Sequence, residues 1–229
     1  MCIVVFFSLI LPIQFIFLQR KKWHKYANFM NRVWSCIVCI LVGHWVFVKN
    51  KKNFKVSKKP FLVVANHSSY IDIPILMWAL PFDARYIGKA ELGKVPIFGY
   101  MFKKLHIPVN RSSKIDSYRA FKRAAQFLKE GMSVVIFPEG TIPENPHQLG
   151  QFKEGAFALA IQKKVPILPV SIIGSRYAFE DPTRLSAMPK KITVIIHEPI
   201  TPTTQTEKEL KTYIYNLLSK SVFGYESKT

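Results

Sequence analysis

From residue 59 onward, short apolar runs alternate with longer segments in which apolar residues recur every three or four positions. The runs Phe61–Ala65 and Ser133–Phe137 are almost continuously apolar, which is typical of strands buried on both faces of a sheet. Segment 117–130 is instead amphipathic with the helical period, and Gly131 after it is a good helix stop. The pattern therefore predicts strands and helices in alternation.

The remaining elements follow the same pattern. Further helices are expected over residues 71–80, 97–105, 156–163 and 207–219, and further strands over 85–87, 107–109, 167–173 and 192–196. Such alternation predicts an α/β fold with a largely parallel sheet flanked by helices. The sequence contains no repeat and no low-complexity linker, so we expect residues 59–229 to form one domain.

Residues 1–58 have a different pattern. Two apolar runs, 1–18 and 33–48, are each followed by a cluster of lysines and arginines. A secretory signal carries its positive charge before the apolar run, so a retained membrane segment is the better interpretation, at the short end of what can span. If both runs crossed the bilayer, their basic clusters would face opposite sides, against the bias of Lys and Arg toward the cytoplasmic face.

We therefore predict that residues 1–58 form an amino-terminal membrane-associating two-helix segment, a shallow hairpin in one leaflet with basic flanks. Residues 59–229 would then lie at the membrane on its cytoplasmic face. Two alternatives stay open. One run spans the bilayer while the other is interfacial, or the two form an ordinary buried helical hairpin.

Composition supports a membrane partner. The 229 residues include 33 Lys and Arg against 14 Asp and Glu, a formal net charge of +19. This balance favours nucleic acid, an anionic bilayer or phosphate-bearing substrates. A hydrophobic fraction of 49% argues against a disordered basic tail and fits a bilayer better than nucleic acid.

Cysteine and histidine usage gives little support for redox or metal chemistry. Cys2, Cys36 and Cys39 all lie in the amino-terminal region and outline no disulfide framework. The spacing of Cys36 and Cys39 is interpreted as packing in an apolar helix rather than as a redox pair. The six histidines show no metal-ligand spacing, so we expect no metal.

Segment Asn66–Asp72 carries the main candidate chemistry. It begins where a buried strand is predicted to end, and ligands of open α/β sheets bind at the carboxyl ends of strands. Along one continuous helix His67 and Asp72 would point about 140° apart, so they can meet only if the chain bends between them. Asp72 would then accept a hydrogen bond from one imidazole nitrogen and leave the other as a base.

A structural alternative exists for the same residues. Ser69-x-x-Asp72 matches a capping box, in which Asp72 only stabilises the start of a helix. His67 would then be a hydrogen-bonded residue at the end of a strand.

Three further segments add weaker signals. Phe137-Pro-Glu-Gly-Thr141 also follows a buried strand, although a Pro–Gly turn with a solvated glutamate would look the same. Lys89 and Arg111 are candidate anion ligands, but most such side chains are simply solvated. The two prolines in Val165–Val170 are expected to shape a strand.

In this order the four segments resemble the glycerophospholipid acyltransferase superfamily, in particular the 1-acylglycerol-3-phosphate acyltransferases. His-x-x-x-x-Asp alone is a weak pattern, but the whole series is specific. The resemblance runs from about Phe61 to Gly174, roughly half of the chain. It favours pairing of His67 with Asp72 over capping alone, and it implies a membrane-associating helical pair ahead of an α/β catalytic domain.

The resemblance implies an O-acyltransferase of phospholipid biosynthesis. The acyl group would pass from a thioester of coenzyme A or acyl carrier protein to the free hydroxyl of 1-acylglycerol-3-phosphate, giving phosphatidic acid without a covalent enzyme intermediate. His67 would be the general base and Asp72 would orient it, with no cofactor beyond the thioester. Ser68 and Ser69 lack a second free base and are not expected to be nucleophiles. The substrate-binding residues implied by the resemblance are Lys89, Arg111, Glu139, Gly140 and Thr141.

The sequence departs from the family pattern at one place. After Phe-Pro-Glu-Gly-Thr the family usually has Arg-Ser, whereas Ile142 and Pro143 follow here. One expected phosphate ligand is therefore missing. Either His147, Lys153 or another base takes its place, or the acceptor is a different lysolipid.

Two other classes of protein compete with this interpretation. A lipid hydrolase would use the same His and Asp to activate water, but the Gly-x-Ser-x-Gly turn that would support one is absent from the sequence. A non-enzymatic basic protein that binds membranes or nucleic acid explains the charge but not four ordered motifs at strand ends. We expect a lysophospholipid, an acyl thioester and an anionic membrane surface as partners, and no nucleic acid.

Overall fold

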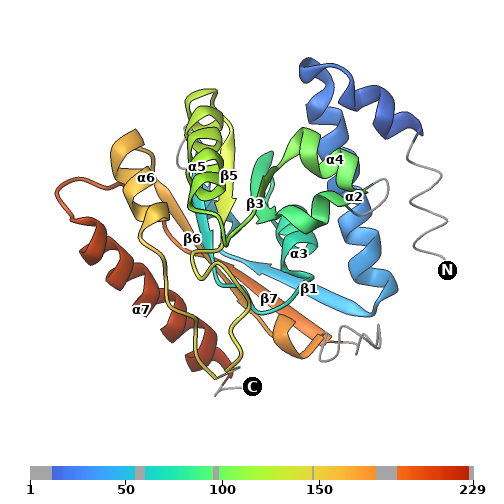
Figure 1. Ribbon diagram of the computed structural model, residues 1–229. Helices are drawn as coiled ribbons and strands as arrows, with labels where there is room; N and C mark the ends of the chain where they lie inside the picture. Colours follow the sequence, from blue (N-terminus) through green and yellow to red (C-terminus); the bar gives the residue numbers. More distant parts are fainter. Residues whose placement is uncertain (1–11, 55–59, 95–97, 146, 179–189, 227–229) are drawn as a thin grey trace.

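A seven-stranded sheet runs through the centre of the molecule (Figure 1), which the computed structural model describes over residues 12–54, 60–94, 98–145, 147–178 and 190–226. The strands are β1 (His44–Lys49), β2 (Leu62–Ala65), β3 (Ala84–Lys89), β4 (Ile107–Val109), β5 (Ser133–Ile136), β6 (Ile167–Ile173) and β7 (Lys190–Ile196). The α-helices with described bounds are α2 (His24–Leu41), α3 (Asp72–Ala79), α4 (Phe98–Leu105), α5 (Lys114–Lys129), α6 (Gly155–Lys163) and α7 (Glu207–Glu226). Four short 3-10 helices join them: η1 (Lys21–Trp23), η2 (Lys51–Phe54), η3 (Ala90–Lys94) and η4 (Ser175–Ala178).

The sheet is largely parallel, as predicted. Its strand order is β1-β7-β6-β2-β5-β3-β4. Strands β2 to β6 run parallel to one another, whereas β7 is antiparallel to β6, and β1 pairs in parallel with β7. Because the carboxyl ends of β2 to β6 emerge at one edge, the segments that follow them are brought to that edge.

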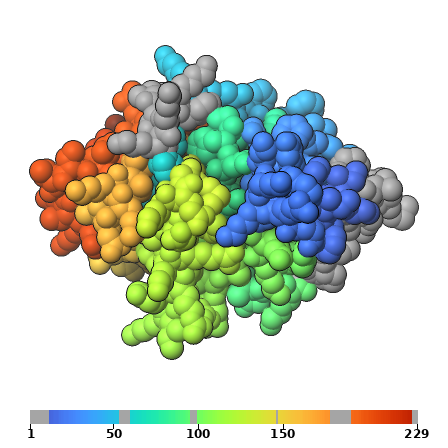
Figure 2. Space-filling view, turned by 90° about the horizontal axis from the view of Figure 1, so that it is seen from above, coloured from blue at the N-terminus to red at the C-terminus, as the bar shows by residue number. Residues whose placement is uncertain are grey.

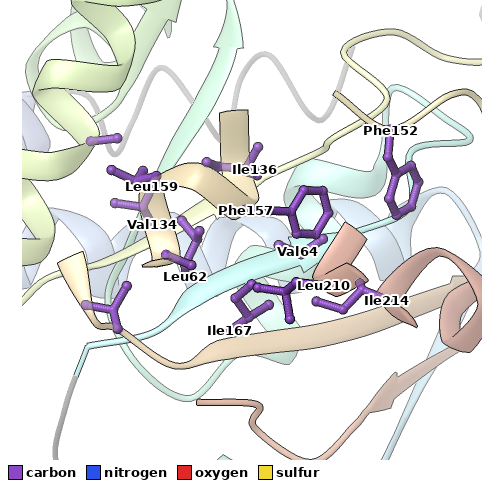
Figure 3. Packing of buried hydrophobic residues seen from close by; sticks show 14 of the residues in the cluster. Leu62, Val64, Val134, Ile136, Phe152, Phe157, Leu159, Ile167, Leu210 and Ile214 are labelled. Carbon is purple, nitrogen blue, oxygen red and sulfur yellow. The ribbon is translucent and has the colours of Figure 1, made fainter. Parts of the chain in front are cut away.

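Helices cover both faces of the sheet (Figure 1), with α2 and α3 on one side and α5, α6 and α7 on the other. Val63 and Ala65 of β2 pack toward α3, whereas Leu62 and Val64 pack toward α6 and α7 (Figure 3). Each central strand therefore has apolar side chains on both faces. This burial explains the continuous apolar runs of the sequence.

The second apolar run, 33–48, contains the end of a helix and then a strand, so the helical prediction for its second half is wrong. Helix α2 ends at Leu41, and Gly43 turns the chain with a φ of 76°, a conformation that favours glycine. The following residues pair with β7 as strand β1. Trp45 and Phe47 are exposed, whereas the valines between and after them pack on the core. This period-two alternation was the signal for a strand.

The rest of the predicted hairpin lies partly outside the described residues. Residues 12–18 are helical, whereas residues 1–11 and the expected domain boundary at 58/59 fall outside the described ranges. Within those ranges we find no helix with both the length and the apolar character needed to cross a membrane. Figure 2 shows the amino-terminal helices, in blue, lying against the green region that includes α4, where Leu18 and Ala27 cluster with Met101 and Leu105.

Candidate active site

The candidate base follows β2 directly. Asn66 is fully buried, and its side-chain amide donates to the carbonyl of Ile172 at 2.9 Å and accepts from the amide of Ile172 at 2.7 Å. These two bonds fix the exit of β2 against β6. His67 comes next, and the chain then bends so that Asp72 opens α3. The bend predicted between His67 and Asp72 is present.

His67 and Asp72 form a buried hydrogen-bonded pair. Nδ1 of His67 lies 2.9 Å from Oδ2 of Asp72, with His67 9% exposed and Asp72 fully buried. The imidazole ring stacks on Phe137, with ring centroids 4.3 Å apart and an interplanar angle of 21°. The carboxylate and the aromatic ring together fix the orientation of the imidazole. Engagement of Nδ1 leaves Nε2 as the nitrogen available for proton transfer.

The same carboxylate also supports the turn between the two residues. Oδ2 of Asp72 accepts from the backbone amides of Ser68 at 2.7 Å and Ser69 at 2.8 Å. The bond from Ser69 is one half of a capping box. The reciprocal half is missing among the described residues, because Oγ of Ser69 is buried without a hydrogen-bond partner. Asp72 therefore stabilises the helix start and engages His67 at the same time, so capping alone does not describe it.

Glu139, at the exit of β5, points into the structure rather than toward solvent. It is 4% exposed, and its carboxylate accepts from the backbone amides of His67 at 2.7 Å and Gly150 at 2.6 Å. Burial raises the pKa of Glu139 to about 7, and these two amide donors act in the opposite direction. Glu139 thus holds together the β2 exit, the β5 exit and the loop that follows β5. Direct contact between Glu139 and an acceptor remains a prediction.

Gly140 and Thr141 complete the turn after β5. Gly140 has a φ of 74°, and Thr141 is exposed. Lys153 lies over Gly140, because a Cβ added to this glycine would come within 2.9 Å of the lysine Nζ.

Lys89 and Arg111 lie together, on the far side of β5 from His67. Lys89 ends β3, is exposed, and has an ion pair with Glu91 at 3.7 Å. Arg111 follows β4, the next strand of the sheet, and is half-buried, which lowers the pKa of its guanidinium. Three strand spacings separate β2 from β4, about 14 Å. Lys89 and Arg111 have long side chains, which shorten this distance toward a group held at His67.

Two cavities open beside the β5 exit. The first, which we call the His67 cavity, has a volume of about 120 Å³ and is lined by residues that include His67, Ser68, Glu139 and Arg176. The second, the Arg111 cavity, has a volume of about 260 Å³ and a mainly apolar lining, with Arg111 and Lys153 as its cationic residues. Glu139 borders the first cavity and its neighbour Gly140 the second, so the turn after β5 lies between them.

Sequence reasoning missed two site residues that follow β6. Ser175 is fully buried, and its hydroxyl lies 2.8 Å from that of Ser68. Arg176 comes next and lines the His67 cavity. Both follow a parallel strand, so the rule that singled out His67 and Glu139 applies to them too.

Comparisons with known proteins identify the family to which this α/β domain belongs. The family model described as "Acyltransferase" matches residues 45–173, more than half of the chain. The chain belongs to this acyltransferase family.

Several relatives have more particular names. The chain is 28% identical over 193 residues to a 1-acyl-sn-glycerol-3-phosphate acyltransferase of Chlamydomonas reinhardtii, covering 83% of this chain and 57% of that protein. It is 33% identical to a probable 1-acyl-sn-glycerol-3-phosphate acyltransferase of Mycoplasma pneumoniae, covering 70% of this chain and 63% of that protein. The chain thus spans about half the length of curated relatives such as the algal one.

A solved structure is similar over almost the whole chain. The crystal structure of the 1-acyl-sn-glycerophosphate (LPA) acyltransferase PlsC of Thermotoga maritima superposes with a TM-score of 0.76 at 26% sequence identity. The superposition covers 96% of this chain and 94% of that protein. The fold of this chain is therefore similar to that of a solved acyltransferase.

Proposed function

We propose that this chain transfers an acyl group from a thioester to the free hydroxyl of 1-acylglycerol-3-phosphate, giving phosphatidic acid. The observation that carries the proposal is the buried pair of His67 and Asp72 at the carboxyl ends of parallel strands, in a member of the acyltransferase family. The acceptor is inferred from the names of the relatives, which include 1-acyl-sn-glycerol-3-phosphate acyltransferases. We propose that the thioester donor carries its acyl group on coenzyme A or on acyl carrier protein.

The proposed reaction needs no covalent bond to the protein. Nε2 of His67 removes the proton of the acceptor hydroxyl as its oxygen attacks the thioester carbonyl carbon. The tetrahedral intermediate collapses, the carbon–sulfur bond breaks, and the imidazolium returns the proton to the leaving thiolate. Asp72 stabilises the imidazolium between these steps, because its Oδ2 is already hydrogen-bonded to Nδ1.

The other predicted residues take supporting roles in this proposal. Lys89 and Arg111 attract the acceptor phosphate from their side of β5. Glu139 positions His67 by accepting from its backbone amide. Gly140 and Thr141 form the turn against which the acceptor would lie, beside the opening of the Arg111 cavity.

Exposed apolar side chains support work at a membrane surface. Helix α2 buries small and polar residues such as Ala27 and Ser35, while Tyr26, Phe29, Val33 and Ile40 are exposed along its outer side. Their spacing places them in one stripe. Basic residues precede this stripe around η1 and follow it near η2, as an anionic surface requires. We place this surface on the cytoplasmic leaflet, where basic flanks are favoured.

The reaction is tested by acyl transfer to 1-acylglycerol-3-phosphate in detergent micelles, with radiolabelled acyl-coenzyme A and acyl carrier protein as separate donors. We expect label in phosphatidic acid, and His67→Ala should lower the rate about 10²–10⁴-fold. Label released as free fatty acid instead would identify a hydrolase. No product from either donor, with folded protein and this acceptor, would overturn the proposal.

A further inference from the structure

The loop after β5 brings one lysine to the place where a phosphate ligand is needed. The sequence has Ile142 where the family pattern has an arginine, yet the Arg111 cavity is lined by a second cation, Lys153. This lysine lies eleven residues after Ile142 (153 − 142) in the sequence. Its place beside Gly140 therefore depends on how the loop folds.

Three contacts fix that loop. The backbone amide of Lys153 donates to the carbonyl of Pro138 at 2.9 Å, which closes the loop at its base. The amide of Gly150 donates to Glu139 at 2.6 Å, which draws the loop toward the buried carboxylate. The missing side chain of Gly140 leaves room for the Lys153 chain, whose Nζ, Cε and Cδ all lie within 3.4 Å of the position that a Cβ would take.

The charge of Lys153 is not neutralised by any side chain that the structure describes. Among the residues that the structure describes, no carboxylate makes an ion pair with it. Its neighbour Glu154 is engaged elsewhere, with Nζ of Lys211 at 2.7 Å. Lys153 and Arg111 therefore bring two positive charges to one cavity whose lining is otherwise mainly apolar. Such a combination suits an amphiphilic anion.

We propose that Lys153 supplies the cation missing at position 142 and binds the phosphate of the acceptor together with Arg111. The inference rests on the proposed function and specifies its phosphate site. Lys153 lies over the exit of β5, between β2 with His67 and β4 with Arg111. A phosphate between Lys153 and Arg111 would keep the adjoining hydroxyl on the His67 side of the turn.

Arg176 is the competing cation, and its position fits less well. It lines the His67 cavity from the β6 side, whereas Lys89 and Arg111 lie beyond β5 in the opposite direction. Its guanidinium also lies over the ring of Phe223, 5.1 Å from the centroid. A phosphate on Arg176 would therefore be on the wrong side of His67 to reach Arg111.

The test compares an acceptor that carries a phosphate with one that does not. We would measure kcat/KM for 1-acylglycerol-3-phosphate and for monoacylglycerol in neutral micelles, and take the ratio. Lys153→Met keeps the aliphatic contact with Gly140 and should lower this ratio about tenfold or more, mainly through KM for the phosphorylated acceptor. Lys153→Arg should restore most of it. Lys163→Met, the same change at an exposed lysine at the other end of α6, is the control.

Two results would overturn the inference. One is a ratio for Lys153→Met equal to that of Lys163→Met, and the other is a selective loss in Arg176→Met instead. Lys153→Gln serves as a second neutral variant if methionine disturbs folding, which thermal unfolding would show.

Binding of sn-glycerol 3-phosphate, measured by calorimetry at low salt, separates this inference from the proposed function. If sn-glycerol 3-phosphate binds in a manner that depends on Lys153 but the protein transfers no acyl group, the proposed acyltransferase function alone is overturned. Transfer that ignores Lys153 would overturn the inference alone, and the absence of both activities would overturn both.

Discussion

The backbone amide of His67 donates a hydrogen bond to the carboxylate of Glu139 at 2.7 Å, so the exits of β2 and β5 are joined at the candidate base itself. The side chain of His67 is held separately by Asp72. The backbone of His67 is thus bonded to the buried carboxylate of Glu139, and its imidazole to the buried carboxylate of Asp72. Because a general base must be placed within hydrogen-bond reach of its proton, both carboxylates would support the proposed catalysis without touching the reacting atoms.

The raised pKa of Glu139 makes stability depend on pH. Burial raises this pKa from 4.5 to about 7, so between these values the unfolded chain is ionised while the folded chain holds the proton. The stability contributed by the protonated carboxyl is therefore lost as pH rises through this window, by up to about 3 kcal/mol. Glu139→Gln does not titrate. Its stability relative to wild type should improve from about pH 5 to about pH 8 in urea denaturation, and a constant difference would contradict the raised pKa.

Replacing Asp72 by asparagine should damage catalysis more than folding. The asparagine amide is neutral and cannot stabilise the imidazolium as the carboxylate does, and its nitrogen, if it takes the place of Oδ2, cannot accept from Nδ1 of His67. We expect kcat to fall about 10²–10⁴-fold through a misplaced or wrong imidazole tautomer. Thermal unfolding and far-UV circular dichroism should show that α3 remains formed. Unchanged turnover would mean that Asp72 acts only as a helix cap.

Ser69→Ala provides the complementary measurement. The hydroxyl of Ser69 is buried and has no hydrogen-bond partner among the described residues, so its removal should leave the free energy of unfolding unchanged or raise it. Loss of a formed capping box would instead cost about 1 kcal/mol. Denaturant titration of this variant beside wild type distinguishes the two. A clear destabilisation would show that Ser69 caps α3.

The exposed stripe on α2 should control membrane binding. Phe29 and Ile40 are 63% and 62% exposed, so serine at both positions should leave the free energy of unfolding almost unchanged. Binding to vesicles with anionic lipid, measured by flotation, should fall at least about tenfold. The matched control is Ile115→Ser, since Ile115 is 65% exposed on α5, on the opposite side of the sheet. Equal losses in both proteins would remove the case for a membrane surface on α2.

Most central strands could be predicted from the sequence, because a strand buried on both faces of the sheet is a continuous run of apolar residues. Strand β2 and strand β6 were predicted within one residue of their observed bounds. The run 33–48 misled because a short apolar segment can be a helix or a strand, and tertiary pairing with β7 decides between them. Gly43 and the alternation that starts at His44 were the local signals of the change.

The candidate site was predictable where its residues follow strands, and less so where a loop returns. His67, Glu139 and Arg111 all follow parallel strands, and the sheet gathers them at one edge. The contact between Lys153 and Gly140 depends instead on hydrogen bonds made within the loop after β5. No periodicity records such a contact. Lys153 appeared only as one of several basic residues that could replace a missing arginine.

Strand β1 is synthesised long before the strand with which it pairs. His44 pairs with Lys190, 146 residues later (190 − 44). During synthesis β1 lacks its partner β7 until these later residues have left the ribosome, and closing so long a loop is slow. Throughout that time a strand with exposed Trp45 and Phe47 is an open edge on which other chains can aggregate. Pairing with β7 covers one edge of β1, which stays at the margin of the finished sheet. The nascent chain is therefore most exposed to aggregation at β1 before β7 emerges.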